Sequence, residues 1–231
     1  MNAVDLFSNI GGHALGFRDA EIQTCAFVEI DKGRQELLQY HFPNISVFND
    51  VRNYVGPKGI GILIGGPPCK KTSVAAAATG NRTGESLWPS MLRVGTNMEP
   101  EWFVVEQPPY ATAWETKVAF DLAEIGYHTA KVEFSASDPG APHIRRRVFI
   151  LAHRCLARLA LAWQAVPTSI CRVKRTLIAR HTWDKGPPRT LRVDAGISNW
   201  LDKNAAIAAI GDANPPAMAE VIGLSIRAAY V

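Results

Sequence analysis

A thiol and a carboxylic acid that each follow a short apolar segment are the first indication of chemistry in this sequence. Cys69 ends the run Gly65-Gly66-Pro67-Pro68-Cys69, in which glycine and proline predict a rigid turn that holds the thiol outside a sheet. Glu106 ends the apolar segment 102–106. If the strands over 60–64 and 102–106 are neighbours, the two groups share one crevice. A thiolate beside a carboxylic acid suits attack on an electron-poor ring, because the acid can protonate a ring nitrogen as charge develops.

Basic side chains accompany both groups. Lys70 and Lys71 follow Cys69 directly and would favour the thiolate if their charges lie close to the sulfur. Arg145 and Arg147 alternate with Arg146, so in an extended segment they point to one side, where they can hold a carbonyl oxygen and a phosphate. Taken singly, a lone cysteine is usually a small buried hydrophobe and the arginines a basic surface hairpin. The combination is what favours a reactive site.

A second group of residues is typical of a site for a nucleoside cofactor. The turn over 5–12 bears Gly11 and Gly12 and joins a predicted strand to a predicted helix, where backbone N–H groups can approach a polar ligand. Glu29 ends the second predicted strand and can accept hydrogen bonds from two ribose hydroxyls, and Asp50 follows the third and can accept from an adenine amino group. Ordinary βα units also contain such turns and acids, so these residues alone leave both interpretations open.

These residues require a scaffold that brings strand ends together. The first 153 residues alternate short apolar runs with helical spacing, which predicts an α/β fold with a doubly wound, mostly parallel sheet. Seven strands are expected, over 3–7, 24–30, 45–48, 60–64, 102–106, 128–134 and 147–152. Helices are expected over 11–17, 32–40, 87–97, 114–125 and 217–229.

The positive charge of the chain is concentrated in one block. The 231 residues carry 25 Lys and Arg against 21 Asp and Glu, and residues 154–192 alone hold nine basic residues and one acidic residue. A polyanion-binding insert and a solvated surface with a chance excess of arginine both give this pattern. Turn signals are expected within the block at Pro167 and at 186–188.

Several protein classes are excluded by composition and spacing. The longest apolar stretch, 155–166, is interrupted by Arg158 and is shorter than the roughly 18 residues that indicate a membrane span. The chain starts without a basic segment followed by an apolar core, so no secretion signal is expected. The four cysteines form no C-x-x-C pair, which argues against a zinc cluster or a disulfide framework. We expect a cytoplasmic protein without a metal and without a membrane partner.

The motifs, taken in order, resemble those of the DNA cytosine-5 methyltransferases. They are Asp5-Leu6-Phe7-x-x-x-Gly11-Gly12, Gly66-Pro67-Pro68-Cys69, Glu106, Arg145-x-Arg147 and Gly211-x-x-x-Pro215-Pro216. The resemblance covers about residues 3–153 and 189–226, and the segment 192–199 is similar to small bacterial and phage enzymes of this family. Chance would have to deliver five separated motifs in the right order.

The resemblance implies a class I methyltransferase fold that uses S-adenosylmethionine. Cys69 would add to C6 of a cytosine flipped out of duplex DNA, Glu106 would hold the N3 edge, and Arg147, supported by Arg145, would hold O2. The implied cofactor residues are Asp5, Phe7, Gly11, Glu29, Ile30, Asp50, Val51, Leu87 and Asp212. The implied DNA-binding residues are Lys70, Lys71, Thr72, Ser73, Arg172, Lys174, Arg175 and Arg180.

The resemblance also implies three regions with separate tasks. Residues 1–153 would form the catalytic and cofactor-binding domain, 154–192 a short basic target-recognition region, and 193–231 a segment that packs back on the first. A recognition region this short fits a short target, a relaxed specificity or help from a partner. The partners implied are double-stranded DNA and, beside it, a restriction endonuclease or an accessory specificity protein.

Some positions depart from the family pattern, and other functions remain open. Asn9 replaces a usual glycine, although asparagine tolerates a left-handed turn. The other departures are Lys70, Gln107-Pro108, His143 and Asp212. The alternatives are an RNA (tRNA) cytosine-5 methyltransferase and a degenerate member that binds DNA without chemistry. A nucleotide-dependent dehydrogenase would explain the first turn and Glu29, but it leaves Cys69 and the basic block without a role.

Overall fold

In the computed structural model of the chain, the described residues are 1–68, 86–109, 112–180 and 214–231, with only the backbone for 178–180. The elements in chain order are β1 (Asn2–Leu6), α1 (Gly12–Asp19), β2 (Gln23–Val28), α2 (Lys32–His41), β3 (Ser46–Phe48), β4 (Ile62–Gly65), α4 (Trp88–Met98), β5 (Trp102–Gln107), α5 (Thr112–Glu124), β6 (His128–Ser135), β7 (Arg146–His153), α6 (Leu156–Arg180) and α9 (Pro216–Ala228).

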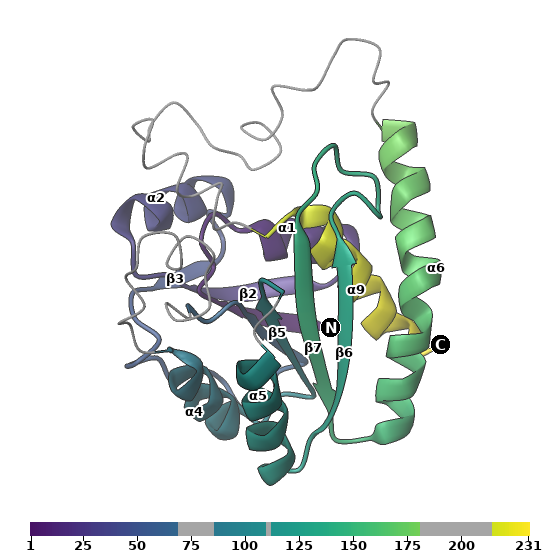
Figure 1. Ribbon diagram of the computed structural model, residues 1–231. Coiled ribbons are helices and arrows are strands. Elements are labelled where there is room, and N and C mark those ends of the chain that lie inside the picture. The colour runs from purple at the N-terminus through teal and green to yellow at the C-terminus, as the bar shows by residue number, and fades with distance from the viewer. Residues whose placement is uncertain (69–85, 110–111, 181–213) are drawn as a thin grey trace.

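The strands form one twisted sheet at the centre of the molecule (Figure 1). Its seven strands have the order β3-β2-β1-β4-β5-β7-β6, in which β7 runs antiparallel to both β5 and β6 and the other pairs are parallel. The prediction of a doubly wound, mostly parallel sheet is confirmed. The strand order reverses between β1 and β4, and ligands of such sheets bind beyond the strand ends at that switch point.

Alternate residues of the central strands face two helical layers. Ile62 and Ile64 of β4 pack in the cluster that contains α1, α6 and α9, whereas Leu63 packs in the cluster with α4 and α5. Both faces of the sheet are therefore apolar, as parallel strands buried on two sides require. A smaller cluster of Ala14, Phe27 and Leu38 packs α1 and α2 against β2.

Helix α9 crosses α1 at very short range and so brings the C-terminal part of the chain to the start of α1. A Cβ added to Gly16 would lie 2.2 Å from the carbonyl oxygen of Pro216. A Cβ added to Gly12 would lie 2.1 Å from the carbonyl oxygen of Asn214. Only glycine fits at these two positions, and the turn before α9 consequently lies beside the loop that follows β1.

Helix α6 corrects one prediction about the basic block. Pro167 does not form a turn but lies inside the 25-residue helix. The cost of an interior proline is about 3 kcal/mol, and the inner face of α6 offsets it by burial against the sheet and α9. That face contributes Leu159, Ala162, Val166 and Val173 to the core, and Ser225 of α9 donates a hydrogen bond to Ser169.

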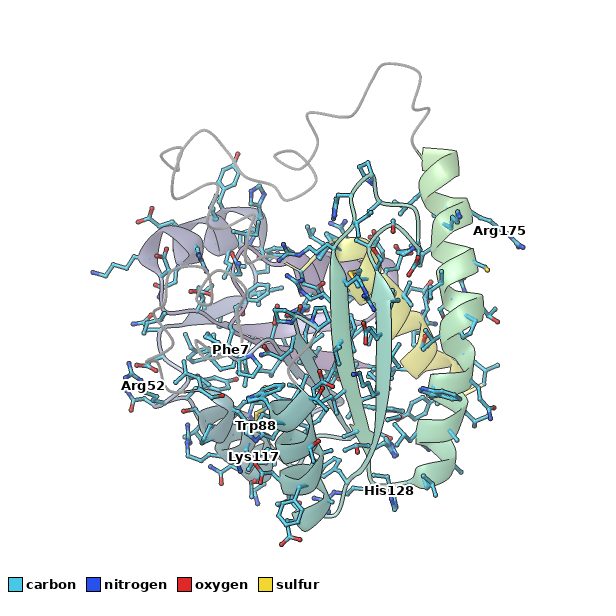
Figure 2. All side chains as sticks on the ribbon, viewed as in Figure 1. Phe7, Arg52, Trp88, Lys117, His128 and Arg175 are labelled. Carbon is cyan, nitrogen blue, oxygen red and sulfur yellow. The ribbon has the colours of Figure 1, made fainter. Side chains whose placement is uncertain are left out.

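The outer face of α6 is charged near its C-terminal end. Arg172, Lys174 and Arg175 are exposed there, and Figure 2 shows Arg175 pointing away from the sheet. Within the described part of the chain, no helix has the length and apolar character needed to cross a membrane.

Candidate active site

The loop after β1 turns sharply because three of its residues have positive φ. Phe7, Asn9 and Gly11 have φ of 57°, 50° and 84°. The left-handed conformation expected of Asn9 is confirmed, and it aims the Asn9 N–H at Glu29. The predicted strand over 3–7 ends one residue early, since Phe7 leaves the β region. Phe7 packs against the α4–α5 cluster (labelled in Figure 2).

Glu29 follows β2 and is buried at the end of the sheet. Its Oε2 accepts from the Asn9 N–H at 2.8 Å and its Oε1 accepts from the Asp31 N–H at 2.9 Å. Burial raises the pKa of the Glu29 carboxyl, while the two backbone N–H groups lower it in part. A carboxylate has about four acceptor positions, so two remain for ribose hydroxyls. Ile30 is 64% exposed beside it and offers an apolar surface.

Asp50 and Val51 lie at the same edge of the sheet, because β3 pairs with β2 up to Phe48 and the Glu29 N–H donates to the Phe48 carbonyl at 2.9 Å. Asp50 accepts from Arg52 at 2.7 Å, and this hydrogen-bonded guanidinium holds the pKa of the carboxyl below its usual value. Val51 is 5% exposed and belongs to the apolar cluster that contains α4 and α5.

The turn that leads to Cys69 is anchored from two sides. Gln107 donates a side-chain hydrogen bond to the Pro67 carbonyl at 2.5 Å, and the Leu87 N–H donates to the Pro68 carbonyl at 3.2 Å. Strands β4 and β5 are parallel neighbours, with Gly65 opposite Val105, as predicted. The turn therefore leaves the sheet next to the end of β5.

Six predicted site residues lie outside the described residues: Cys69, Lys70, Lys71, Thr72, Ser73 and Asp212. The side chain of Arg180 is likewise not described.

Glu106 and Arg147 meet at this edge of the sheet. Arg147 Nε forms an ion pair with Glu106 Oε1, and the two side chains are only 12% and 10% exposed. A Cβ added to Gly66 would lie 2.6 Å from Glu106 Oε2, so the acid borders the turn toward Cys69 directly. Arg146 pairs instead with Glu133, so Arg146 and Arg147 point to opposite sides of the strand as predicted, while the direction of the Arg145 side chain stays a prediction.

Arg145 precedes β7, and its carbonyl accepts from the Ala136 N–H at 3.1 Å. Its supporting role stays a prediction.

The sequence analysis missed two polar residues of this site, His13 and Asn214. His13 directly follows Gly11-Gly12, and Asn214 directly precedes Pro215-Pro216. Both side chains are buried, and the signal that the sequence offered was a polar residue beside each of these motifs. His13 Nδ1 lies 2.9 Å from Asp5 Oδ1. A small cavity at the edge of the sheet is lined by Phe7, Ser8, Asn9, Gly12, His13, Gly66, Glu106 and Asn214.

Comparison with known families decides the relationship of the chain. The family model for C-5 cytosine-specific DNA methylases matches residues 1–176. The chain belongs to this family. The type II methyltransferase M.DdeI of Desulfomicrobium norvegicum is 27% identical over 166 residues, which cover 65% of this chain and 40% of that protein. The type II methyltransferase M.CviJI of Paramecium bursaria Chlorella virus IL3A is 33% identical over 157 residues, 65% of this chain and 42% of that protein. The chain thus spans less than half the length of these two methylases.

Solved structures agree on the fold. A protein described as a DNA modification methyltransferase encoded within an Escherichia coli prophage superposes with a TM-score of 0.66 at 17% identity, over 98% of both chains. A mutant of Spodoptera frugiperda DNMT2 superposes with a TM-score of 0.55 at 16% identity, over 66% of this chain and 50% of that one. At these identities the likeness supports the class I methyltransferase fold and nothing finer.

Proposed function

We propose that this methylase transfers a methyl group from S-adenosylmethionine to C5 of a cytosine flipped out of double-stranded DNA. The observation that carries the proposal is the buried ion pair of Glu106 and Arg147 beside the anchored turn that leads to Cys69. A carboxyl and a guanidinium held together suit the N3 and O2 edge of a cytosine, since one can donate a proton and the other a hydrogen bond.

The residues at the strand ends fit the cofactor. Glu29 retains acceptor positions for the ribose hydroxyls, and the exposed Ile30 offers an apolar contact for the adenine. Asp50 and Leu87 border the same edge, and Phe7, Gly11 and Asp5 belong to the strand and loop that would support the methionine part. Among the described residues, no group of three or more metal-ligating side chains is assembled. When bound, S-adenosylmethionine supplies the electrophilic methyl group.

The reaction proceeds through a covalent adduct on the base. The Cys69 thiolate adds to C6 while Glu106 gives a proton to N3, which makes C5 nucleophilic enough to take the methyl group. Arg147 steadies the ring through O2, with Arg145 in support. Loss of the C5 proton and elimination of the thiolate then release Cys69.

The basic block supplies contacts to the DNA backbone. Arg172, Lys174 and Arg175 are exposed on α6 near the end that leads into residues 181–192, where they suit phosphate contacts. Lys70, Lys71, Thr72 and Ser73 would close over the target, and Arg180 would extend the basic face. Residues 154–192 would then recognise the target, with an accessory specificity protein or a restriction endonuclease as a further partner.

The proposal is tested by covalent trapping. The full chain is incubated with S-adenosylmethionine and genomic DNA to map 5-methylcytosine, and then with a duplex carrying 5-fluorocytosine at the mapped target. An adduct that survives denaturation is expected for the wild type and for Cys171→Ser, which changes an exposed cysteine on α6, but not for Cys69→Ser. Absence of wild-type methylation and adduct would refute the proposal, and preferential methylation of a tRNA competitor would redirect it to RNA.

A further inference from the structure

A buried histidine–carboxylate pair lies beneath the loop after β1, and the reaction proposed above gives no step to its histidine. His13 in α1 and Asp5 in β1 are 5% and 0% exposed. His13 Nδ1 lies 2.9 Å from Asp5 Oδ1, so the carboxylate accepts the Nδ1 proton and fixes the tautomer of the ring. The other ring nitrogen, Nε2, is buried and has no hydrogen-bond partner among the described residues.

His13 reaches the reacting edge through the cavity described above. His13 and Glu106 both line it, together with uncharged groups such as Asn214, whose side-chain amide also lacks a hydrogen-bond partner among the described residues. Buried polar atoms of this kind are normally satisfied, so two unpartnered polar side chains on one cavity indicate that a water or another polar group binds there.

The charges around His13 come from several elements. They are Asp5 on β1 and Glu106 on β5, and the latter is paired with Arg147 on β7. The buried Glu220 of α9 does not line the cavity. Burial lowers the pKa of His13, but the carboxylates of Asp5 and Glu106 together raise it by more than burial lowers it. The pKa therefore lies above its usual value. His13 therefore carries a proton at a pH at which an ordinary histidine is losing it.

Glu106 must deliver a proton in the proposed reaction, because N3 of the base takes one up as the thiolate adds. The Glu106 side chain is paired with Arg147, whose guanidinium keeps its protons, so a second proton source has to lie near Glu106. His13 lines the same cavity as Glu106, and its buried Nε2 has no hydrogen-bond partner among the described residues.

We propose that His13, oriented by Asp5, is a positioning residue that exchanges one proton with Glu106 across this cavity. The inference rests on the function proposed above. As the thiolate adds, Glu106 gives its proton to N3 and takes one from Nε2 of the imidazolium through a water in the cavity. On elimination, N3 returns the proton to Glu106, and Glu106 returns one to Nε2, so that no proton is gained or lost.

The first test needs no substrate. The pKa of His13 is measured by NMR in the ligand-free wild type and in Glu106→Gln, which keeps the shape of the side chain but removes its charge. Because the Glu106 carboxylate raises the pKa of His13, this pKa is expected to fall in the variant if the two groups are coupled across the cavity. The matched control is His153, a buried histidine at the end of β7, where it pairs with Trp102 at the start of β5. An unchanged His13 titration would overturn the proposal.

The second test follows the reaction. In His13→Gln, Glu106 must be protonated from solvent, so the alkaline limb of the kcat–pH profile is expected to move down by about one unit, with about a tenfold loss near neutral pH. His153→Gln should leave the profile in place, and binding of S-adenosylmethionine should be the same in all three proteins. A His13→Gln profile that keeps the wild-type shape would overturn the inference. If the wild type methylates nothing, the proposed function fails, and the NMR result still decides the coupling.

Discussion

The strand-end edge and helix α6 place their polar groups by opposite rules. At the edge, Glu29 and Glu106 are buried, and each is held by hydrogen bonds or an ion pair from a neighbouring loop or strand. On α6, Arg172, Lys174 and Arg175 are exposed, and the inner face is apolar and belongs to the core. The edge thus uses its buried polar groups to fix positions, whereas α6 combines a structural face with a charged one. A sequence motif predicts where a side chain lies, whereas the net charge of a block of residues does not.

The largest effect on the rate is expected at Arg147, in comparison with its neighbour Arg146 on β7. Arg147→Met removes the partner of Glu106 and leaves a buried carboxylate, so single-turnover methyl transfer should fall by roughly 10²–10³-fold. Arg146→Met removes only the more exposed pair with Glu133 and should change the rate less than about twofold. Transfer of labelled methyl groups to the mapped duplex measures both. Equal reductions in the two variants would show that the edge depends on net charge alone and not on the position of each guanidinium.

Two leucines of α6 test whether its inner face belongs to the core. Leu159 is 2% exposed and Leu161 is 50% exposed. Leu159→Ala should lower the free energy of unfolding by about 2–3 kcal/mol, because it removes buried methyl groups and leaves a cavity. Leu161→Ala should cost less than about 0.5 kcal/mol. Urea denaturation followed by circular dichroism measures both, and equal costs would contradict the assignment of α6 to the core.

The sequence predicted the edge better than it predicted α6, and the reason is physical. Strand ends follow from short apolar runs, and the turns after them need Gly, Pro or Asn at defined positions, as the positive φ of Asn9 illustrates. Pro167 predicted a turn, but burial of Val166 and the Ser169–Ser225 hydrogen bond keep the helix continuous. These interactions involve α9, about 50 residues further along the chain, and no local pattern reports them.

The same limit explains why His13 was missed. Its position in the first turn of α1 is evident from the sequence, but its pairing with Asp5 depends on how the loop over 7–11 folds back over β1. A histidine in that turn could equally have faced solvent. Sheet order alone places Glu106 beside Gly66 in the turn after β4, without such a loop, which is why this proximity was predictable.

The charged face of α6 should affect binding without affecting folding. The triple variant Arg172→Gln, Lys174→Gln, Arg175→Gln is expected to bind duplex DNA about tenfold more weakly near 150 mM salt. The slope of log K against log salt should decrease by about one for each phosphate that the variant no longer neutralises. Tm should stay within about 2 °C, because the three side chains are exposed. Lys117→Gln on α5 is the single-charge control, and an equal reduction per charge there would mean that the basic face has no special role.

The smallest effect is expected at Glu29, where the edge meets the cofactor. Glu29→Gln keeps one acceptor oxygen, so the affinity for S-adenosylmethionine should fall by only about fivefold. Burial raises the pKa of the Glu29 carboxyl, so the wild-type group takes up its proton at a higher pH than free glutamate and then has fewer acceptor positions. Wild-type affinity should therefore decrease as the pH falls through that pKa, and the variant should show no such decrease.

Calorimetric titration between pH 4.5 and 8 measures this dependence, with the exposed Glu36→Gln on α2 as the control. If the variant keeps the wild-type pH dependence, the ribose is not held by Glu29, and the buried carboxylate serves only to fix the N–H groups of Asn9 and Asp31. In that case the edge would resemble α6 after all, with a structural role for its buried groups and ligand contacts made elsewhere.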